Sequence, residues 1–402
     1  MKRLTKVLLV TMFLSVVTCA VVSAAEPLVL WAPPGESPVL QRLITQWSKE
    51  TGIEVTIVDV PYIAQHEKLA LDGPAGRGPD VFTTPHDQLG KLVLPGLVSP
   101  ITVNEQALKA FPSGILEAVS YGGELYGLPR SAEGVALVYN KDLLPEIPET
   151  MDELISWART LPEGVYGFLY EVNNVFMSWG FFSGYDAYVF GQTEQGYDVL
   201  DLGLDRPEAV RALEFLVDLA TSGLIPPGTD YGVANSLFLE GKVGATINGS
   251  WALGDYRQAG LNYGIGLIPP LQDGGTHRTW VTVGGWWVSA FSQKQEQAIQ
   301  LIEFLASEQV VVELFEEVGT VPAHLGALEH PAVKSDPDLQ GFARQSSLGS
   351  PTPNVPEMVA VWGPFMDAVK LAINGDATPQ VALTLAVSDL RETIEDMRAR
   401  SQ

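Results

Sequence analysis

Few side chains in this 402-residue sequence have the spacing that catalysis or metal binding requires. The single cysteine, Cys19, excludes an intrachain disulfide and a cysteine-based metal cluster. The five histidines do not pair at helical i, i+4 spacing around a glutamate, so we expect no histidine metal site. The sequence has no G-x-S-x-G motif and no G-x-x-x-x-G-K-[ST] phosphate loop. We therefore expect no catalytic residue, no metal and no cofactor.

The acidic residues leave one enzymatic alternative open. Two carboxylates on either side of a glycosidic bond are sufficient for glycoside hydrolysis, and a sequence does not give their separation. With 48 acidic residues, candidate pairs are always present. A secreted glycoside hydrolase is therefore an alternative that the residues alone do not remove.

Tryptophans at the ends of strands are the feature that most favours a binding site. Trp251 follows Asn-Gly-Ser after an apolar strand, Trp286 follows two glycines, and Trp362 follows a proline-rich segment. An indole face can stack on the C–H face of a sugar ring, while the sugar hydroxyls bond to carboxylates and amides. These positions predict a carbohydrate site, and the alternative is that the same tryptophans belong to the core.

Composition limits the class of partner. With 46% hydrophobic and 18% charged residues, a chain of this length can fill two hydrophobic cores, so we expect two domains. The balance of 24 basic against 48 acidic residues gives a net charge of −24. Phosphate contacts need clustered basic side chains, so nucleic acid is not expected as a partner, and a neutral or cationic ligand is favoured.

The N-terminus is typical of a secretory signal. Three basic residues precede an apolar run over residues 7–22, and small residues follow it at the position of a cleavage site. We expect residues 1–25 to be removed and the mature protein to lie in the periplasm or at the cell surface. Lipidation of Cys19 is a second possibility, although Thr18 is larger than the residue usually found before a lipidated cysteine.

The order of the elements indicates an α/β fold. Residues 28–31 form an apolar run of strand length, Ser37 and Pro38 are suited to the N-cap and first position of a helix that ends at Gly52, and residues 53–60 alternate as a strand. A strand, a helix and a strand in about 30 residues form a βαβ unit, which implies a parallel sheet. The chain has no Pro/Ser-rich linker, so we expect it to cross between its two domains more than once.

Several longer motifs resemble one family. They closely resemble the maltose/maltodextrin-binding proteins, the extracellular family 1 solute-binding proteins of bacterial ABC importers, in the family's order and at similar spacing: GPDVF (78–82), LVYNKDLLP (137–145), FLVDL (215–219), TDYGVANSLFLEGKVGATINGSW (229–251), NYGIGLIP (262–269) and PNVPEM (353–358). The resemblance covers nearly all of the mature chain.

The resemblance implies a two-lobed α/β periplasmic-binding-protein fold of type II, with a ligand cleft between mainly parallel sheets. The N-lobe would comprise residues 26–131 and 286–331, and the C-lobe residues 132–285 and 332–402. It also implies capture of a maltodextrin-type oligosaccharide by lobe closure, delivery to a membrane permease, a monomeric state and no catalysis. A same-fold protein for a different sugar or another solute stays open as an alternative.

Four candidate binding residues follow from matching family positions. Asp87 lies in the family's His-Asp pair, and Glu133 precedes LVYNKDLLP at the position of a sugar-contacting glutamate. Trp251 and Trp362 match two C-lobe tryptophans that stack on sugar rings. The resemblance therefore implies that carboxylates and indoles face each other across the cleft.

The sequence also departs from the family. The Asn-Gly-Asp-Lys turn after the first strand is replaced by Ala-Pro-Pro-Gly-Glu, so only Glu36 can stand in for its charged residues. Phe176 occupies the position of a tyrosine, and Thr84 that of a tryptophan. Trp286 stands where a small residue is usual, and we expect it to supply a replacement stacking surface. These changes bear on which sugar is bound.

Overall fold

The computed structural model describes residues 26–193, 196–226, 228–272 and 275–400. The predicted signal peptide and Cys19 lie outside these residues. Within the described ranges, no helix is both long enough and apolar enough to cross a membrane.

The predicted βαβ unit is present at the start of the described chain. Strands β1 (Leu28–Ala32) and β2 (Val55–Asp59) are parallel, and helix α1 (Ser37–Thr51) connects them. Helix α1 ends at Gly52, whose φ of 75° lies in the left-handed region that glycine adopts without strain. One apolar face of α1 is buried, as its spacing predicts.

The start of α1 differs from the prediction by one residue. Ser37 is helical, and Glu36 takes the N-cap position without a capping hydrogen bond from its side chain. The Ser37 hydroxyl instead donates to the Asp59 carboxylate on β2. The Glu36 carboxylate is thus free of helix capping and can make contacts elsewhere.

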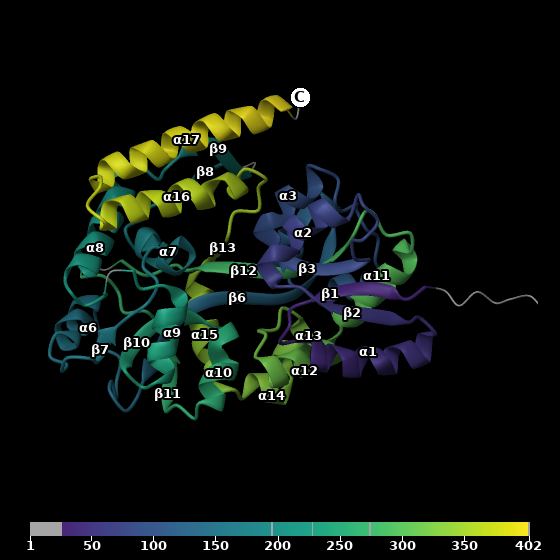
Figure 1. Ribbon diagram of the computed structural model, residues 1–402, viewed down its shortest axis with the longest axis horizontal. Helices are drawn as coiled ribbons and strands as arrows, with labels where there is room; N and C mark the ends of the chain where they lie inside the picture. The colour runs from purple at the N-terminus through teal and green to yellow at the C-terminus, as the bar shows by residue number, and fades with distance from the viewer. Residues whose placement is uncertain (1–25, 194–195, 227, 273–274, 401–402) are drawn as a thin grey trace, which may run out of the picture.

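A single mixed sheet runs through the molecule in the order β2-β1-β3-β12-β6-β10-β7, as Figure 1 shows. Strand β3 (Val81–Pro85) is parallel to β1 and antiparallel to β12 (Trp280–Val288). The 14-residue strand β6 (Gly127–Asn140) pairs with β12 through its first half and with β10 (Val243–Gly249) through its second half. One strand therefore belongs to both halves of the sheet.

The remaining elements near β1–β3 cover the first half of the sheet. They are η1 (Tyr62–Ala64), α2 (Gln65–Asp72), η2 (His86–Gln88), α3 (Leu89–Val93), α4 (Glu105–Lys109), α5 (Ser113–Ala118), β4 (Ser120–Tyr121), β5 (Glu124–Leu125), α11 (Gln295–Leu305), α12 (Glu308–Val318), α13 (Leu325–Glu329) and α14 (Pro331–Lys334).

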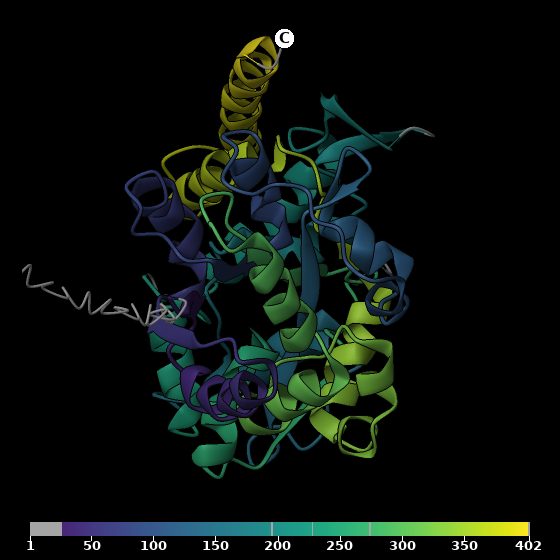
Figure 2. The ribbon, with the colours of Figure 1, turned by 90° about the vertical axis from the view of Figure 1, so that its right-hand side faces the viewer.

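The elements of the second half come from the middle and the end of the chain. They are α6 (Met151–Ala158), β7 (Tyr166–Phe168), α7 (Val175–Gly184), β8 (Phe190–Thr193), β9 (Gly196–Leu202), α8 (Pro207–Thr221), α9 (Tyr231–Leu239), η3 (Ser250–Ala252), α10 (Leu253–Gln258), β11 (Tyr263–Gly266), α15 (Pro337–Leu348), β13 (Ser350–Pro351), α16 (Met358–Ile373) and α17 (Pro379–Arg400). Helix α17 packs on α16 at one edge of the molecule (Figures 1 and 2).

Separate hydrophobic cores occupy the two halves. The largest buried cluster draws its residues from 135–280 and 342–394, whereas two neighbouring clusters draw theirs from 28–128 and 283–323. A small fourth cluster joins α12, α13 and α14 to α15. Strands β6 and β12 thus each lead from one core into the other. The residue boundaries of the two lobes given above remain a prediction.

Strands β6 and β12 approach each other closely at Gly127. A Cβ at this position would lie 2.5 Å from the carbonyl oxygen of Trp286 and 2.6 Å from the Trp287 ring. We expect Gly127→Ala to push the two strands apart and to lower the free energy of unfolding by about 1–3 kcal/mol, measured by urea denaturation.

Gly114→Ala is the matched control, because a Cβ there would meet no described atom within 4 Å. Helix α5 should tolerate alanine at this position without loss of stability, since alanine has the higher helix propensity. Equal stability of the two variants would contradict the proposed role of the strand contact.

Candidate functional site

A pocket of about 200 Å³ lies where the two halves of the sheet meet. Its walls come from the turn after β1, from η1, from β6, from η3 and from the end of α12. The lining residues are Pro33, Glu36, Tyr62, Arg130, Ser131, Glu133, Trp251, Val318 and Thr320. Residues distant in the sequence therefore converge on one small cavity.

A buried ion pair forms one wall of this pocket. The Arg130 guanidinium donates from Nη2 to Oε1 of Glu36 at 2.6 Å, and their side chains are only 4% and 10% exposed. The guanidinium lies over the Trp286 ring, 4.9 Å from its centroid, and 5.6 Å from that of Tyr62. Burial by itself lowers the pKa of Arg130, but the charge of Glu36 raises it, and the net shift is upward. The arginine therefore stays charged.

A β-bulge brings Arg130 to the pocket together with Glu133. Gly284 pairs with Ser131 and Gly285 with Pro129, so the register of β6 against β12 skips Arg130. In a regular strand, residues three apart point to opposite faces. A bulge inserts one residue and re-aims the side chains beside it, so both charged groups can line the same cavity.

Glu133 is a partly buried carboxylate in this pocket. Burial raises its pKa, whereas the charge of Arg130 and a backbone hydrogen bond from Val321 act in the opposite direction; the net shift is upward. Glu133 consequently takes up a proton at a higher pH than an exposed glutamate does.

An aromatic row extends from the pocket into the second half of the molecule. The Phe176 ring lies 6.4 Å from that of Trp251 and 6.5 Å from that of Trp280, and Trp280 meets Trp362 edge to face at 5.2 Å. Trp179 stacks on Trp280 at 4.2 Å. Trp251 is 41% exposed, whereas Trp280 is 1% exposed. The row therefore has a buried centre and an exposed end at the pocket.

Local structure fixes the ends of this row. Trp251 follows β10 directly, and a side chain at Gly249 would overlap its ring, so glycine allows the indole to fold across the backbone. Phe176 lies in the first turn of α7, where the Asn174 side chain caps the helix by accepting from the Phe176 and Met177 backbone amides. Trp362 lies on α16 and is half-buried.

The structure brings most of the candidate residues together. Glu36, Glu133 and Trp251 line the pocket, Phe176 contacts Trp251, and Trp362 lies at the other end of the aromatic row. Three of these side chains thus share one cavity and two continue from it.

Asp87 lies near the pocket without lining it. It is buried in η2 and accepts a hydrogen bond of 2.7 Å from the Gln88 amide. Its negative charge acts on the nearby Tyr62 hydroxyl. Burial raises the pKa of Tyr62, the charge of Arg130 lowers it, and the charges of Asp87 and the other carboxylates raise it further. Asp87 therefore contributes to the negative potential at this edge of the pocket.

Trp286 differs from the expectation of a stacking surface. Its side chain is fully buried in the core beneath β1 and β12, and the Arg130 guanidinium covers its ring. A ligand in the pocket meets Arg130 and not the indole. The expectation is wrong for this structure because both faces of β12 are covered: Trp286 lies in one hydrophobic cluster and its neighbour Trp287, on the opposite face, lies in another.

Arg130, Tyr62 and Trp280 are not among the site residues expected from the sequence. A signal for Arg130 exists: it and Glu133 are the only charged residues in the otherwise apolar and small-residue strand 127–140. Charges are rarely buried unless they are paired or serve a site. Tyr62 and Trp280 have no comparable local signal, because their position depends on tertiary packing.

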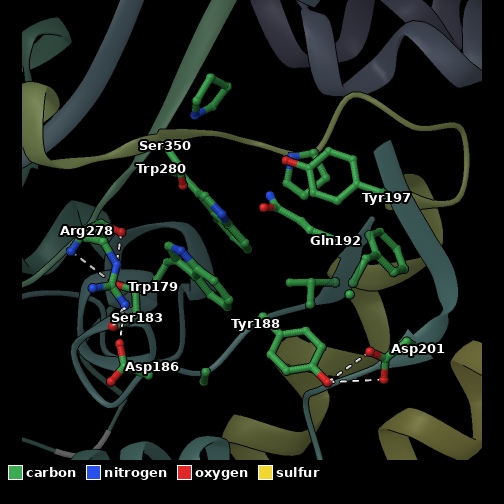
Figure 3. Close-up of a pocket in the computed structure, with 16 residues that line it drawn as sticks. Trp179, Ser183, Asp186, Tyr188, Gln192, Tyr197, Asp201, Arg278, Trp280 and Ser350 are labelled. Atoms are coloured by element: carbon green, nitrogen blue, oxygen red, sulfur yellow. Dashed lines mark hydrogen bonds and ion pairs between the residues drawn. The ribbon is translucent and has the colours of Figure 1, made fainter. Parts of the chain in front are cut away.

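A second cavity, of about 500 Å³, lies next to the aromatic row and is lined by Trp179 and Trp280 of that row and by Tyr197 (Figure 3). Its charged groups have partners: Arg278 pairs with Asp186 at 2.7 Å. In the smaller pocket, Oε2 of Glu36 has no hydrogen-bond partner among the described residues. An unpartnered buried carboxylate oxygen favours the smaller pocket as the functional site.

The structure offers no metal-binding arrangement in the part of the chain that it describes, where no group of three or more His, Cys, Asp or Glu side chains is placed to hold an ion. Arg130 neutralises part of the carboxylate charge of the pocket. Its carboxylates, guanidinium and indole face are therefore suited to bind a hydroxyl-rich molecule with apolar faces.

Proteins similar to this chain in sequence and fold are named for the solutes that they bind. Residues 42–341 match the family described as bacterial extracellular solute-binding protein. A galactooligosaccharide-binding protein of Bacillus subtilis is 33% identical over 93% of this chain and 90% of its own length. A cyclo/maltodextrin-binding protein crystallised with maltotetraose is 38% identical with a TM-score of 0.81, covering 93% of this chain and 99% of its own.

A further structural match is the maltotriose-binding protein of Thermus thermophilus bound with maltotriose, 31% identical with a TM-score of 0.85, covering 91% of this chain and all of its own. These likenesses confirm the predicted two-lobed α/β fold of periplasmic binding proteins. The family match extends through both lobes. The chain therefore belongs to the bacterial extracellular solute-binding proteins.

Proposed function

We propose that the protein captures a maltodextrin-type oligosaccharide outside the cytoplasm and delivers it to the permease of an ABC importer. The observation that carries this proposal is the pocket in which Glu36, Arg130 and Glu133 face the exposed indole of Trp251. Carboxylates accept the protons of sugar hydroxyls, and the indole covers the apolar face of a sugar ring. The structural relatives that bind maltotetraose and maltotriose support the same ligand class.

A galactooligosaccharide is the second candidate. The Bacillus subtilis relative named for this ligand is similar over nearly the whole chain. Glucose and galactose differ in the orientation of one hydroxyl, so the placement of a few hydrogen-bonding groups decides between them. Glu36, Phe176 and Thr84 each differ from the residue that is usual in the family, so the hydrogen-bonding groups at these positions differ as well.

The origin of the lining residues supports lobe closure. Arg130 lies on the part of β6 that pairs with β12, whereas Trp251 follows β10 in the other half. A ligand that touches both groups binds the closed arrangement more tightly than the open one, and only this difference can shift the equilibrium. The lobes would be residues 26–131 with 286–331 and residues 132–285 with 332–402.

The predicted signal sequence supports a location in the periplasm or at the cell surface, where such a protein meets its ligand as a monomer. Residues 1–25 would be cleaved, or Cys19 would carry a lipid anchor. The family consists of binding proteins and not of enzymes, so the glycoside hydrolase left open by the sequence is excluded.

A thermal-shift panel tests the ligand class. Maltose, maltotriose, galactobiose, galactotriose, a polyol and a tripeptide would each be added, and the unfolding midpoint recorded. We expect maltotriose at one hundred times its Kd to stabilise the protein by about 2.7 kcal/mol. A larger shift with galactotriose would favour the second candidate, and no shift with any oligosaccharide would contradict the proposal.

Two tryptophan variants separate binding from packing. Trp251 is half exposed at the pocket, so Trp251→Ala should weaken maltotriose binding at least tenfold while changing stability by less than about 1 kcal/mol. Trp280 is buried, so Trp280→Ala should cost about 3–5 kcal/mol of stability. Calorimetry and urea denaturation measure the two effects, and full affinity in Trp251→Ala would argue against this site.

The raised pKa of Glu133 predicts a pH dependence of affinity. Protonation removes a charged acceptor, so binding should weaken as the pH falls through this raised pKa, earlier than for an ordinary glutamate. Because a hydrogen bond to a charged group contributes roughly 1–1.5 kcal/mol more than one between neutral groups, the loss should reach about tenfold. Glu133→Gln should bind more weakly at neutral pH and show a flatter profile; an unchanged profile would contradict the assignment.

A further inference from the structure

The Glu36–Arg130 pair is placed at the pocket by two irregularities of the backbone. The bulge in β6 sets Arg130 outside the regular register, and Glu36 occupies a helix N-cap position that its side chain does not use. Arg130 is then fixed by the Trp286 ring and by a contact of 3.3 Å from Nη1 to the Thr83 hydroxyl. Such a pair is pre-organised before any ligand arrives.

The pair is not fully satisfied within the protein. Oε2 of Glu36 and Nε of Arg130 are buried, and neither has a hydrogen-bond partner in the described part of the chain. Leaving buried polar atoms unpaired is costly, so well-packed structures rarely do it without a functional reason. The missing partners are a donor for Glu36 and an acceptor for Arg130. A sugar hydroxyl can act as either.

The charges around the pocket do not balance. Glu36 and Glu133 line it with Arg130 as the single cation, and Asp87 adds a further negative charge close by. The whole chain also carries a net charge of −24. A carboxylate on a ligand would meet repulsion from three acids, while its attraction to Arg130 is already used by Glu36.

We propose that the Glu36–Arg130 pair makes the pocket selective for uncharged sugar rings and rejects a ring that carries a carboxylate, with Arg130 acting as the residue that positions Glu36. This inference rests on the proposed oligosaccharide function and adds a charge criterion to it. Glu36 supplies the repulsion, and Arg130 holds that carboxylate at the pocket through the 2.6 Å contact while offsetting part of its negative charge.

The test compares maltotriose with two of its oxidised derivatives, each of which carries one C6 carboxylate, on one or the other terminal ring. Calorimetry gives the Kd of each, and the selectivity ratio is the Kd of the more weakly bound carboxylated derivative divided by that of maltotriose. The ratio is measured for the wild type, Glu36→Gln, Arg130→Met and Arg130→Lys. Arg130→Lys keeps the positive charge and serves if Arg130→Met does not fold.

The expected changes have opposite signs. Glu36→Gln leaves the arginine charge unpaired, so the ratio should fall at least tenfold. Arg130→Met leaves the carboxylates unneutralised, so the ratio should rise at least tenfold, whereas Arg130→Lys should stay near the wild type. If the pair had only a structural role, its loss would weaken the binding of all three ligands in the same proportion. Ratios within twofold of the wild type in Glu36→Gln and Arg130→Met would therefore overturn the inference.

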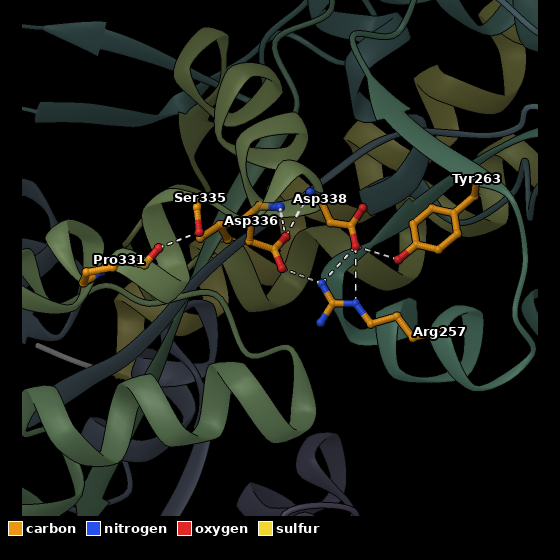
Figure 4. A network of polar contacts seen from close by, with 7 residues as sticks. Arg257, Tyr263, Pro331, Ser335, Asp336 and Asp338 are labelled. Carbon is orange, nitrogen blue, oxygen red and sulfur yellow. Dashed lines mark hydrogen bonds and ion pairs between the residues drawn. The ribbon is translucent and has the colours of Figure 1, made fainter.

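Arg257→Met is the matched control. Arg257 also pairs with carboxylates, at 2.8 Å from Asp336 and 2.9 Å from Asp338, and the latter accepts from the Tyr263 hydroxyl (Figure 4). This network joins α10 to the start of α15 and does not line the pocket. Its loss should lower stability without changing the ratio. If the wild-type protein bound no maltotriose, the proposed function itself would fail, and that result differs from an unchanged ratio.

Discussion

The pairing of β6 with two different sets of strands is the constraint on which this structure depends. Its first half is hydrogen-bonded to β12 and its second half to β10 and β11, so one continuous backbone belongs to two hydrophobic cores. Strand hydrogen bonds fix the register of side chains to within one residue. Every group that β6 carries near its middle is therefore placed at the junction of the cores, where Arg130, Ser131 and Glu133 line the pocket.

That constraint also explains why the site needs an irregular strand. A regular strand would present Arg130 and Glu133 on opposite faces. The bulge opposite Gly284 and Gly285 lets both reach the same cavity. Gly284 also leaves room for the Arg130 side chain, because a Cβ there would lie 2.9 Å from Cγ of Arg130. The cost of burying the arginine is offset by the Glu36 carboxylate and by two aromatic rings. Backbone pairing, bulge and ion pair thus form one arrangement.

The fold could be predicted from the sequence further than the site could. Helix α1 ends at Gly52 as its spacing and glycine indicate, and the strand–helix–strand order gave the correct class. Local patterns are sufficient for such elements because they depend on neighbouring residues. Trp286 shows the limit: its position after two glycines suggests an exposed ring, yet helices and strands distant in the sequence cover both faces of β12 and bury it. The charge of Arg130 in a largely apolar strand is visible in the sequence, but its place beside Glu133 in the pocket depends on the bulge, which the partner strand sets.

Three of the buried polar atoms without a partner in the described part of the chain lie in the two walls of the site. Oε2 of Glu36, Nε of Arg130 and Nε1 of Trp362 are all buried without a partner among the residues described, and they belong to the charged wall and to the aromatic row. Each such group lowers the stability of the unliganded protein, and a ligand that supplies its partner recovers that free energy on binding. Because the groups lie in different halves of the molecule, a ligand recovers most when it reaches them together. The same unsatisfied atoms that cost stability would therefore favour the proposed closure around an oligosaccharide.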